Sequence, residues 1–356
     1  MAKNITYLLG AGASYNALPI VKDIPNALND FSEEFNPSIL NNSHPNSSII
    51  YKDNIINNYL SQHEELKNNS EYILKFHNDI VWLKKESEKH TSIDTFAKKL
   101  HLKEDYENLK RLKIILSCFF LYLQTKKFDN RYDSFFASIL DNLSELPGNL
   151  KILSWNYDSQ LEIAFNRFSN STIENTRKVL NVFSKGQKTN LNPAKPNEFC
   201  VFKVNGTTNA TNNKNEIYDI LLDFDSKELS LAEDLLELYS TKANYKLYNP
   251  NMSFAWENFN QELQFYSNLR ESIEKTDILI VIGYSLPFFN RKIDRFILDS
   301  MDNLKKIYVQ DPKYAEGIIE KIKELIPSHN IKFQNRDKIE FKPLSFTDQF
   351  FIPIEF

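Results

Sequence analysis

The chain has 356 residues, of which 42% are hydrophobic and 25% are charged, and its net charge at pH 7 is -4. This composition predicts a folded protein with a sizeable core, and its 43 basic against 47 acidic residues give no overall electrostatic sign of nucleic-acid binding. With only 2 cysteines the chain cannot build a four-cysteine zinc site, so we expect two reduced core cysteines and no zinc.

The apolar segments of the chain are short. The first residues run directly into an apolar strand without the long apolar region of a signal peptide. The most apolar helical stretch, Leu112 to Leu123, is shorter than the roughly 20 residues that cross a bilayer. We therefore expect a cytoplasmic protein with no membrane association and no bound nucleic acid.

Strand patterns alternate with helical patterns along most of the chain. A buried strand is expected at 5–9, helical patterns fill residues 40–146, and the alternation then resumes. Later strands are expected at 151–155, 199–204, 277–282, 306–310 and 339–344, and helices at 158–168, 226–242, 254–275 and 314–326. This order predicts an α/β fold: a doubly wound, mostly parallel Rossmann-like sheet. We expect one domain over residues 1–356, with 40–146 as a large helical insertion.

Four of the 7 glycines follow predicted strands, at the edge where open α/β sheets bind ligands. They are Gly10, Gly12, Gly206 and Gly283. Gly10 and Gly12 would let a phosphate approach the backbone, while Ser14 offers a hydroxyl and the next helix offers free N–H groups. The alternative is that these are ordinary turn glycines. We favour a nucleotide site because the polar residues beside them suit one.

The first glycine pair belongs to neither of two common nucleotide motifs. Tyr15 stands where the dehydrogenase fingerprint G-x-G-x-x-G has its third glycine, and the G-K-[ST] ending of a P-loop is missing. Hydride transfer and phosphoryl transfer therefore both lose support.

Four segments, each after a predicted strand, resemble the NAD-binding motifs of the sirtuin superfamily. In chain order they read "GAGAS" (10–14), "SWNYD" (154–158), "VNGT" (204–207) and "IGYS" (282–285). The resemblance implies NAD as the bound molecule and an NAD-binding set made of Gly10, Ala11, Gly12 and Ser14 at the pyrophosphate, Pro19 and Lys22 in a loop over the cofactor, Gly206, Gly283 and Ser285 in the later motifs, and Asp311 near the adenosine.

Within that superfamily the chain is most similar to bacterial sirtuin-like proteins of antiphage defence. The segments "GYSLPFFNRKID" and "HTSIDTFAKKL" carry this likeness, together with the missing zinc cysteines. The resemblance implies an NAD⁺ glycohydrolase that consumes NAD as its substrate during abortive infection. It also implies regulated activity, through a homo-oligomer and through a partner encoded nearby, such as an ATPase or nucleotide-processing subunit, or a phage-derived trigger. The helical insertion is the expected assembly surface.

The chain departs from sirtuins at the catalytic histidine, where it has Asn205. An asparagine cannot accept a proton near neutral pH, which disfavours protein deacylation. Hydrolysis of NAD remains possible because nicotinamide leaves as a neutral molecule. Asp158 would then stabilise the positive transition state, Asn156 would orient water or ribose hydroxyls, and Asn205 would bind the ribose.

Three alternatives stay open. Asp158 could simply cap the helix after it, because aspartate is a favoured N-cap. His90 or His101 could supply a base from the helical insertion, although a surface or capping role is the simpler interpretation of each. The whole chain could be a weak or inactive module that binds NAD or ADP-ribose in a defence complex, because Asn205 replaces the histidine.

Overall fold

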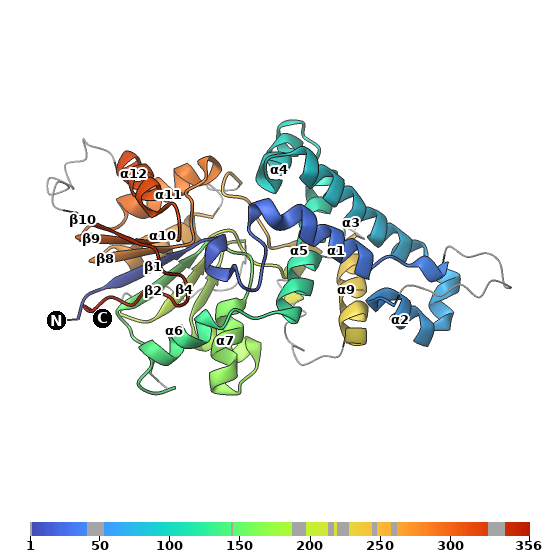
Figure 1. Cartoon of the computed structure of the whole chain (residues 1–356), viewed down its shortest axis with the longest axis horizontal. Coiled ribbons are helices and arrows are strands. Elements are labelled where there is room, and N and C mark those ends of the chain that lie inside the picture. Colours follow the sequence, from blue (N-terminus) through green and yellow to red (C-terminus); the bar gives the residue numbers. More distant parts are fainter. Residues whose placement is uncertain are drawn as a thin grey trace. The chain divides into compact units, whose positions relative to one another are not determined.

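The computed structural model describes residues 2–40, 53–143, 145–186, 197–212, 217–218, 228–243, 248–257, 262–326 and 339–356. The chain divides into two compact units (Figure 1). Unit 1 consists of Met1–Leu18, Lys127–Thr207 and Asn251–Phe356, and unit 2 of Pro19–Lys126 and Thr208–Pro250.

Unit 1 is built on a seven-stranded sheet in which every pair of neighbouring strands is parallel. The strand order is β10-β9-β8-β1-β2-β4-β3. The strands are β1 (Ile5–Leu9), β2 (Leu150–Ser154), β3 (Val182–Ser184), β4 (Cys200–Lys203), β8 (Ile278–Ile282), β9 (Lys306–Gln310) and β10 (Glu340–Leu344). The expected α/β fold with a Rossmann-like parallel sheet is confirmed.

Helices cover both faces of this sheet because its central strands are apolar on both sides. In β1, Ile5, Tyr7 and Leu9 join one buried cluster and Leu8 joins the other. The first cluster includes α6 (Arg131–Ile139) and α7 (Gln160–Ser169), to which α8 (Ile173–Val179) is attached. The second includes α10 (Leu263–Ile273), α11 (Arg291–Asp299) and α12 (Ala315–Leu325), seen on the other side of the sheet in Figure 1. This two-sided cover makes the sheet doubly wound.

The direction of winding reverses at β1. After β1 the chain adds β2, β3 and β4 on one side, and it then returns to add β8, β9 and β10 on the other. The pairs Leu9–Ser154 and Leu9–Ile282 put the carboxyl ends of β2 and β8 level with that of β1. Such a reversal leaves a crevice at the carboxyl edge of an open sheet, where ligands bind.

Unit 2 is mainly helical. Its helices are α1 (Ile24–Glu34), α2 (Ile55–Gln62), α3 (Glu71–Lys89), α4 (Ile93–Leu102), α5 (Tyr106–Lys126) and α9 (Glu228–Ala243). It also has an antiparallel sheet of β5 (Ala210–Asn212), β6 (Ile217–Tyr218) and β7 (Tyr248–Pro250). Aromatic rings form part of its core: Phe31 contacts Phe35, Phe76, Phe119 and Tyr122.

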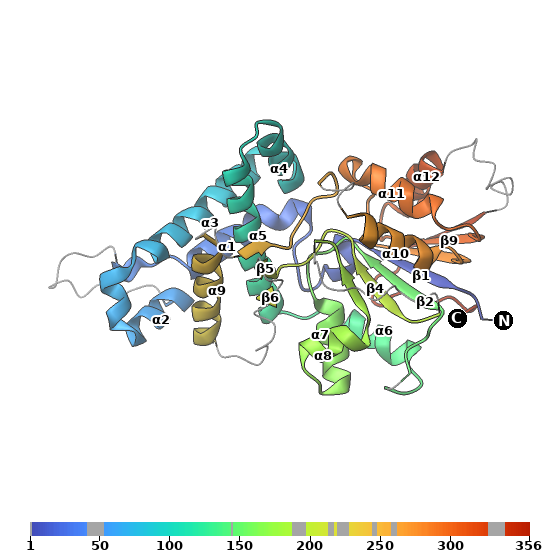
Figure 2. The ribbon, with the colours of Figure 1, turned by 180° about the vertical axis from the view of Figure 1, so that it is seen from behind.

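The helical region has different bounds from those expected. The sequence predicted 40–146, whereas unit 2 starts at residue 19, ends its first segment at 126 and regains residues 208–250. Helix α6 lies in unit 1 because Phe135 and Phe136 pack in the core cluster of the sheet. Helix α9 packs against α2 and α5, far from it in sequence (Figure 2). Periodicity reports local structure and cannot show such distant packing.

Other expected elements differ at their ends. The helix predicted over 254–275 is present only as α10; residues 254–257 form a turn in which the Glu257 carboxylate accepts from Phe254 N–H at 2.7 Å, and 258–261 lie outside the described residues. Residues 226 and 227, expected to begin α9, also lie outside them. Cys118 and Cys200 are buried and form no disulfide, as predicted. Among the described residues, every helix is too short or too polar to cross a membrane.

Candidate functional site

The glycine turn after β1 packs directly against the turn after β8. Gly10 N–H donates to Ile282 O at 3.0 Å, and Gly12 N–H donates to Gly283 O at 2.9 Å. A Cβ atom on Gly10 would lie 2.6 Å from Tyr284 Cα, and one on Gly12 would lie 2.7 Å from Gly283 Cα. The two glycines are therefore needed for the approach of two backbones. Their own N–H groups have protein acceptors, so these two groups add no donors for a phosphate.

The helix expected to offer N–H groups to a phosphate is also absent from this position. The chain continues from Gly10 into a four-residue 3₁₀ helix, η1 (Ala11–Ser14), whereas the first α-helix after β1 begins at Ile24 in unit 2. The backbone after β1 therefore offers a bound anion one short turn, and not the N-terminus of an α-helix.

The turn after β8 holds two residues in left-handed backbone conformations. Gly283 has φ +59°, and Leu286 has φ +50°, which is unusual for a residue with a side chain. Ser285 between them is exposed, and its carbonyl accepts from Lys321 Nζ at 2.9 Å. Strained backbone of this kind concentrates at ligand sites.

Asn156 joins the end of β2 to the β1 turn. Its amide nitrogen donates to Gly10 O at 2.9 Å and to Ser14 Oγ at 3.3 Å. Ser14 is buried and its hydroxyl also lies 3.0 Å from the Tyr132 hydroxyl. Both residues thus have structural partners within unit 1, in addition to the cofactor roles expected of them.

Asp158 is buried one residue before Ser159, the N-cap of α7, and it accepts from the N–H of Gln160, the first helical residue, at 3.0 Å. Burial raises the pKa of the Asp158 carboxyl, while the Lys203 ammonium and the Ser14 hydroxyl oppose that rise. Lys203 Nζ donates to Asp158 O at 2.6 Å and forms a buried ion pair with Glu162 at 3.1 Å. Asp158 thus contacts the first turn of α7 without being its N-cap, and its carboxylate stays at the carboxyl edge of the sheet.

Asn205 lies at the end of β4, beside β2. Its amide nitrogen donates to Trp155 O at 3.3 Å, and its carbonyl accepts from Ser253 N–H at 2.8 Å. Its side-chain oxygen is buried without a hydrogen-bond partner. The next residue, Gly206, has φ +79°, and a Cβ atom there would overlap Asn251 O. The ends of β2 and β4 thus bring Asn156, Asp158 and Asn205 to one edge of the sheet.

A buried ion pair that the sequence did not reveal fixes the β1 turn. Arg131 donates to Asp129 through Nε at 2.9 Å and through Nη2 at 2.5 Å, and its Nη2 also reaches Gly12 O at 3.2 Å and Ala13 O at 3.1 Å. Burial raises the pKa of the Asp129 carboxyl, but the hydrogen bonds and the charge of Arg131 have the larger, opposite effect. The pKa of Asp129 therefore lies below its usual value. Arg131 and Asp129 are two residues apart, but the contacts of Arg131 with Gly12 and Ala13 span more than 110 residues, so no local motif predicts them.

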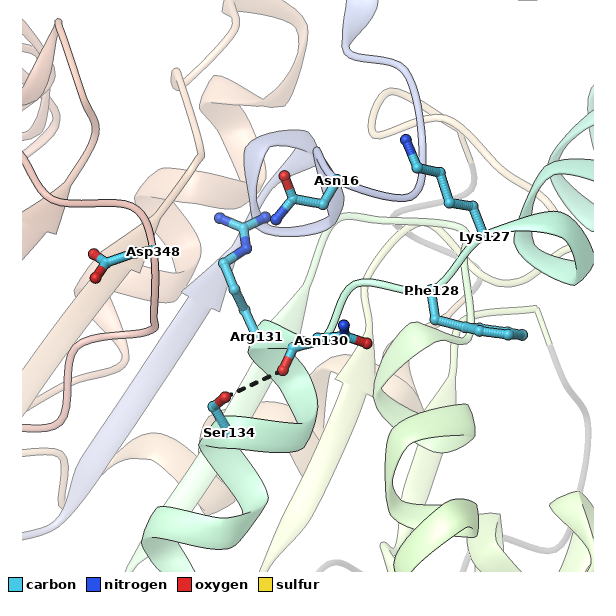
Figure 3. Close-up of a pocket in the computed structure, with 7 residues that line it drawn as sticks. All are labelled: Asn16, Lys127, Phe128, Asn130, Arg131, Ser134 and Asp348. Carbon is cyan, nitrogen blue, oxygen red and sulfur yellow. Dashed lines mark hydrogen bonds between the residues drawn. The ribbon is translucent and has the colours of Figure 1, made fainter.

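A cavity of about 370 Å³ opens beside this pair (Figure 3). In Figure 3 the Arg131 guanidinium extends toward Asn16, while Phe128 points away to the other side. The lining residues are Asn16, Lys127, Phe128, Asn130, Arg131, Ser134 and Asp348. Since Arg131 is neutralised by Asp129, Lys127 and Asp348 supply one remaining charge of each sign, and the cavity has no clear preference for an anion.

Comparison with known proteins does not assign the chain to a family. No protein-family model matches the chain, and no curated protein is significantly similar to it. The resemblance of its motifs to those of sirtuins therefore remains a hypothesis.

A buried acid in the first turn of α11, Asp294, contacts the turn after β8, and the sequence did not single it out. Tyr284 OH lies 2.8 and 2.9 Å from the two carboxyl oxygens of Asp294, and Asn290 Nδ2 donates to Tyr284 OH at 2.9 Å. Burial raises the pKa of Asp294 to about 8, although the hydrogen bonds from the Tyr284 hydroxyl oppose this. The only signal was that all three residues lie in the quoted segment "GYSLPFFNRKID".

The other residues expected to bind NAD lie before α12, in η1 and in unit 2. Asp311 accepts from Lys313 N–H at 2.9 Å and Tyr314 N–H at 2.6 Å and so shapes the start of α12. Ala11 is exposed in η1. Pro19 and Lys22 belong to unit 2, beside or within the 3₁₀ helix Val21–Asp23. Their contact with NAD stays a prediction.

The histidines considered as substitute bases have local partners in unit 2. His90 Nδ1 lies 2.8 Å from Glu86 O, its ring packs 4.8 Å from Phe96, and the His101 ring lies 6.0 Å from that of Tyr106. His44 and His329 lie outside the described residues. Within the described ranges, no group of three or more histidine, cysteine, aspartate or glutamate side chains could hold a metal ion.

Proposed function

We propose that the chain binds NAD at the carboxyl edge of the seven-stranded sheet and hydrolyses the bond between nicotinamide and ribose. One observation carries this proposal: Asn156, Asp158 and Asn205 reach the same edge from β2 and β4, next to the β1 turn where the winding reverses. That edge is where open α/β sheets bind nucleotides.

The chemistry suits a site without histidine. Water attacks the ribose carbon, neutral nicotinamide leaves, and ADP-ribose and a proton are released. The transition state carries positive charge on the ribose, which the Asp158 carboxylate would stabilise, while the two asparagines would orient hydroxyls or water. A base would add roughly 10²–10⁴-fold to the rate, so Asn205 predicts a slow enzyme.

The burial of Asp158 fits a cationic substrate. Burial alone raises the pKa of this carboxyl, which disfavours its charged form. The pyridinium ring of NAD is positively charged, and a positive charge nearby favours the carboxylate. Binding of NAD would therefore favour the charged form of the group that the reaction needs.

The biological role follows from the resemblance alone. We propose an NAD-depleting effector of antiphage defence that acts in abortive infection, and whose activity depends on a homo-oligomer, on a partner protein encoded nearby or on a phage-derived trigger. Restraint is required because unregulated hydrolysis would empty the host of NAD.

A second candidate is a regulatory module that binds NAD or ADP-ribose without turnover. It is favoured by Asn205 and by the β1 turn, whose Gly10 and Gly12 N–H groups already have acceptors. Binding would then depend on side chains from β2 and β4.

The deciding experiment incubates the full chain with NAD, alone and after co-purification with its neighbouring gene products, and measures nicotinamide and ADP-ribose by chromatography. We expect both products in equal amounts, with at least a roughly tenfold loss in Asp158→Asn and a smaller loss in Asn156→Ala. Asn197→Ala is the matched control, because this exposed asparagine lies before β4, at the opposite edge of the sheet.

The outcomes separate the candidates. NAD binding without nicotinamide release in any preparation would leave the regulatory module. Products that form equally well in Asp158→Asn would exclude this site, and acetyl-ADP-ribose from an acylated peptide would instead indicate deacylation.

A further inference from the structure

Two buried side-chain oxygens at the end of β4 have no hydrogen-bond partner. They are Asn205 Oδ1 and Ser253 Oγ, and the two residues are only 6% and 8% exposed. An unpaired buried polar atom is disfavoured, and its presence in a folded protein calls for an explanation. Ser253 lies outside the four motifs that carry the sirtuin resemblance.

The backbone holds these two residues together. Ser253 N–H donates to Asn205 O at 2.8 Å, and the Tyr157 hydroxyl donates to Ser253 O at 3.0 Å. Lys185 Nζ donates to Phe254 O at 3.2 Å, directly after Ser253. The two residues therefore sit on a fixed frame formed by the ends of β2, β3 and β4.

The orientation of the Asn205 amide follows from its other contact. Trp155 O can only accept a hydrogen bond, so the Asn205 nitrogen must face it, as it does at 3.3 Å. Asn205 Oδ1 is then an acceptor that requires a donor. The Ser253 hydroxyl can donate or accept, so together they match a group that carries a donor beside a second polar atom.

We propose that Ser253 and Asn205 form a polar subsite for such a group of the bound ligand, and that Ser253 is its second binding residue. The inference rests on the proposed function for the identity of the ligand: in NAD, the ribose next to nicotinamide and the nicotinamide carboxamide both have this chemistry. A ligand group that fills the subsite satisfies both oxygens at once.

The subsite is tested by calorimetric titration of the full chain with ADP-ribose, ADP and nicotinamide. ADP lacks the second ribose, and nicotinamide lacks any ribose, so the three ligands separate the two sources of the group. Ser253→Ala is expected to reduce either the preference for ADP-ribose over ADP or the affinity for nicotinamide by about three- to tenfold. The affinity for ADP should not change.

The thermal stability of the free protein is the second readout. Ser253→Ala removes a hydroxyl that has no partner, so its melting temperature should be unchanged or raised, whereas loss of a structural hydroxyl would lower it. Ser117→Ala is the matched control: Ser117 is a buried serine of α5 whose hydroxyl also lacks a partner. It should leave every affinity unchanged. The double variant of Ser253 and Asn205 should be less than additive if both bind one group.

Each outcome has a clear meaning. Unchanged affinities for all three ligands in Ser253→Ala would overturn the subsite even if NAD is hydrolysed. Altered selectivity without NAD turnover would support the subsite and refute the hydrolase. Failure of all three ligands and of NAD to bind the wild-type chain would overturn both proposals.

Discussion

The β1 turn and the β4 turn lie at the same edge of one sheet, but they differ in whether their polar groups have hydrogen-bond partners. Around the β1 turn, Gly10, Gly12 and Ser14 all have protein partners, and Arg131 binds the carbonyls of Gly12 and Ala13. At the β4 turn, Asn205 Oδ1 and Ser253 Oγ have none. A glycine-rich sequence can thus mark the scaffold of a site, while its ligand-binding atoms lie one strand away.

The largest effect is expected from a substitution that disrupts the β1 turn. Arg131→Met should lower the free energy of unfolding by about 3–5 kcal/mol, because it leaves Asp129 as a buried unpaired charge and frees two turn carbonyls. Urea unfolding measures this change. The double variant Arg131→Met with Asp129→Leu should recover much of the loss, and a loss below about 1 kcal/mol in the single variant would show that the pair does not fix the turn.

A change of pH probes Asp294 of α11, which accepts hydrogen bonds from Tyr284 in the turn after β8. The pKa of Asp294 is about 8 in the folded chain, against about 3.9 for a free aspartate. The folded state therefore retains a proton that the unfolded state loses, so this group stabilises the fold fully below about pH 4 and less as pH rises toward 8.

Asp294→Asn should remove this pH dependence. Between pH 5 and 8 the wild type should lose up to about 1.4 kcal/mol of stability per pH unit relative to the variant. Thermal unfolding over this range measures the difference. Parallel profiles for the two proteins would mean that Asp294 is ionised in the fold.

The smallest effect is expected when the same substitution, asparagine to alanine, is made at each of the two turns. Asn156→Ala leaves the buried Gly10 carbonyl and Ser14 hydroxyl with fewer partners and should cost about 1–3 kcal/mol. Asn205→Ala removes one long bond together with an unpaired oxygen, and should cost at most about 1 kcal/mol. Chemical unfolding of both variants tests the contrast, which would be lost if Asn205 proved the costlier site.

The sequence predicted the central sheet because β1 and β8 are apolar on both faces and each is followed by glycine. It did not predict β3, which has three residues, or the place of α9, which depends on packing against helices more than 100 residues earlier. For the site, the sequence grouped Asn156, Asp158 and Asn205 because they follow predicted parallel strands, whose carboxyl ends share one edge, and because their motifs resemble those of sirtuins. It missed Arg131, Asp294 and Ser253, whose roles arise from burial and distant partners.

The proposed function requires a nucleotide to bind where β2 and β4 end. A crystal structure of the full chain with ADP-ribose tests it most directly. We expect the ligand beside Asp158, with a hydroxyl within hydrogen-bond distance of Asn205 Oδ1. ADP-ribose bound elsewhere in unit 1, for example in the cavity lined by Asn130 and Ser134, with Asn205 Oδ1 still unpaired, would contradict it.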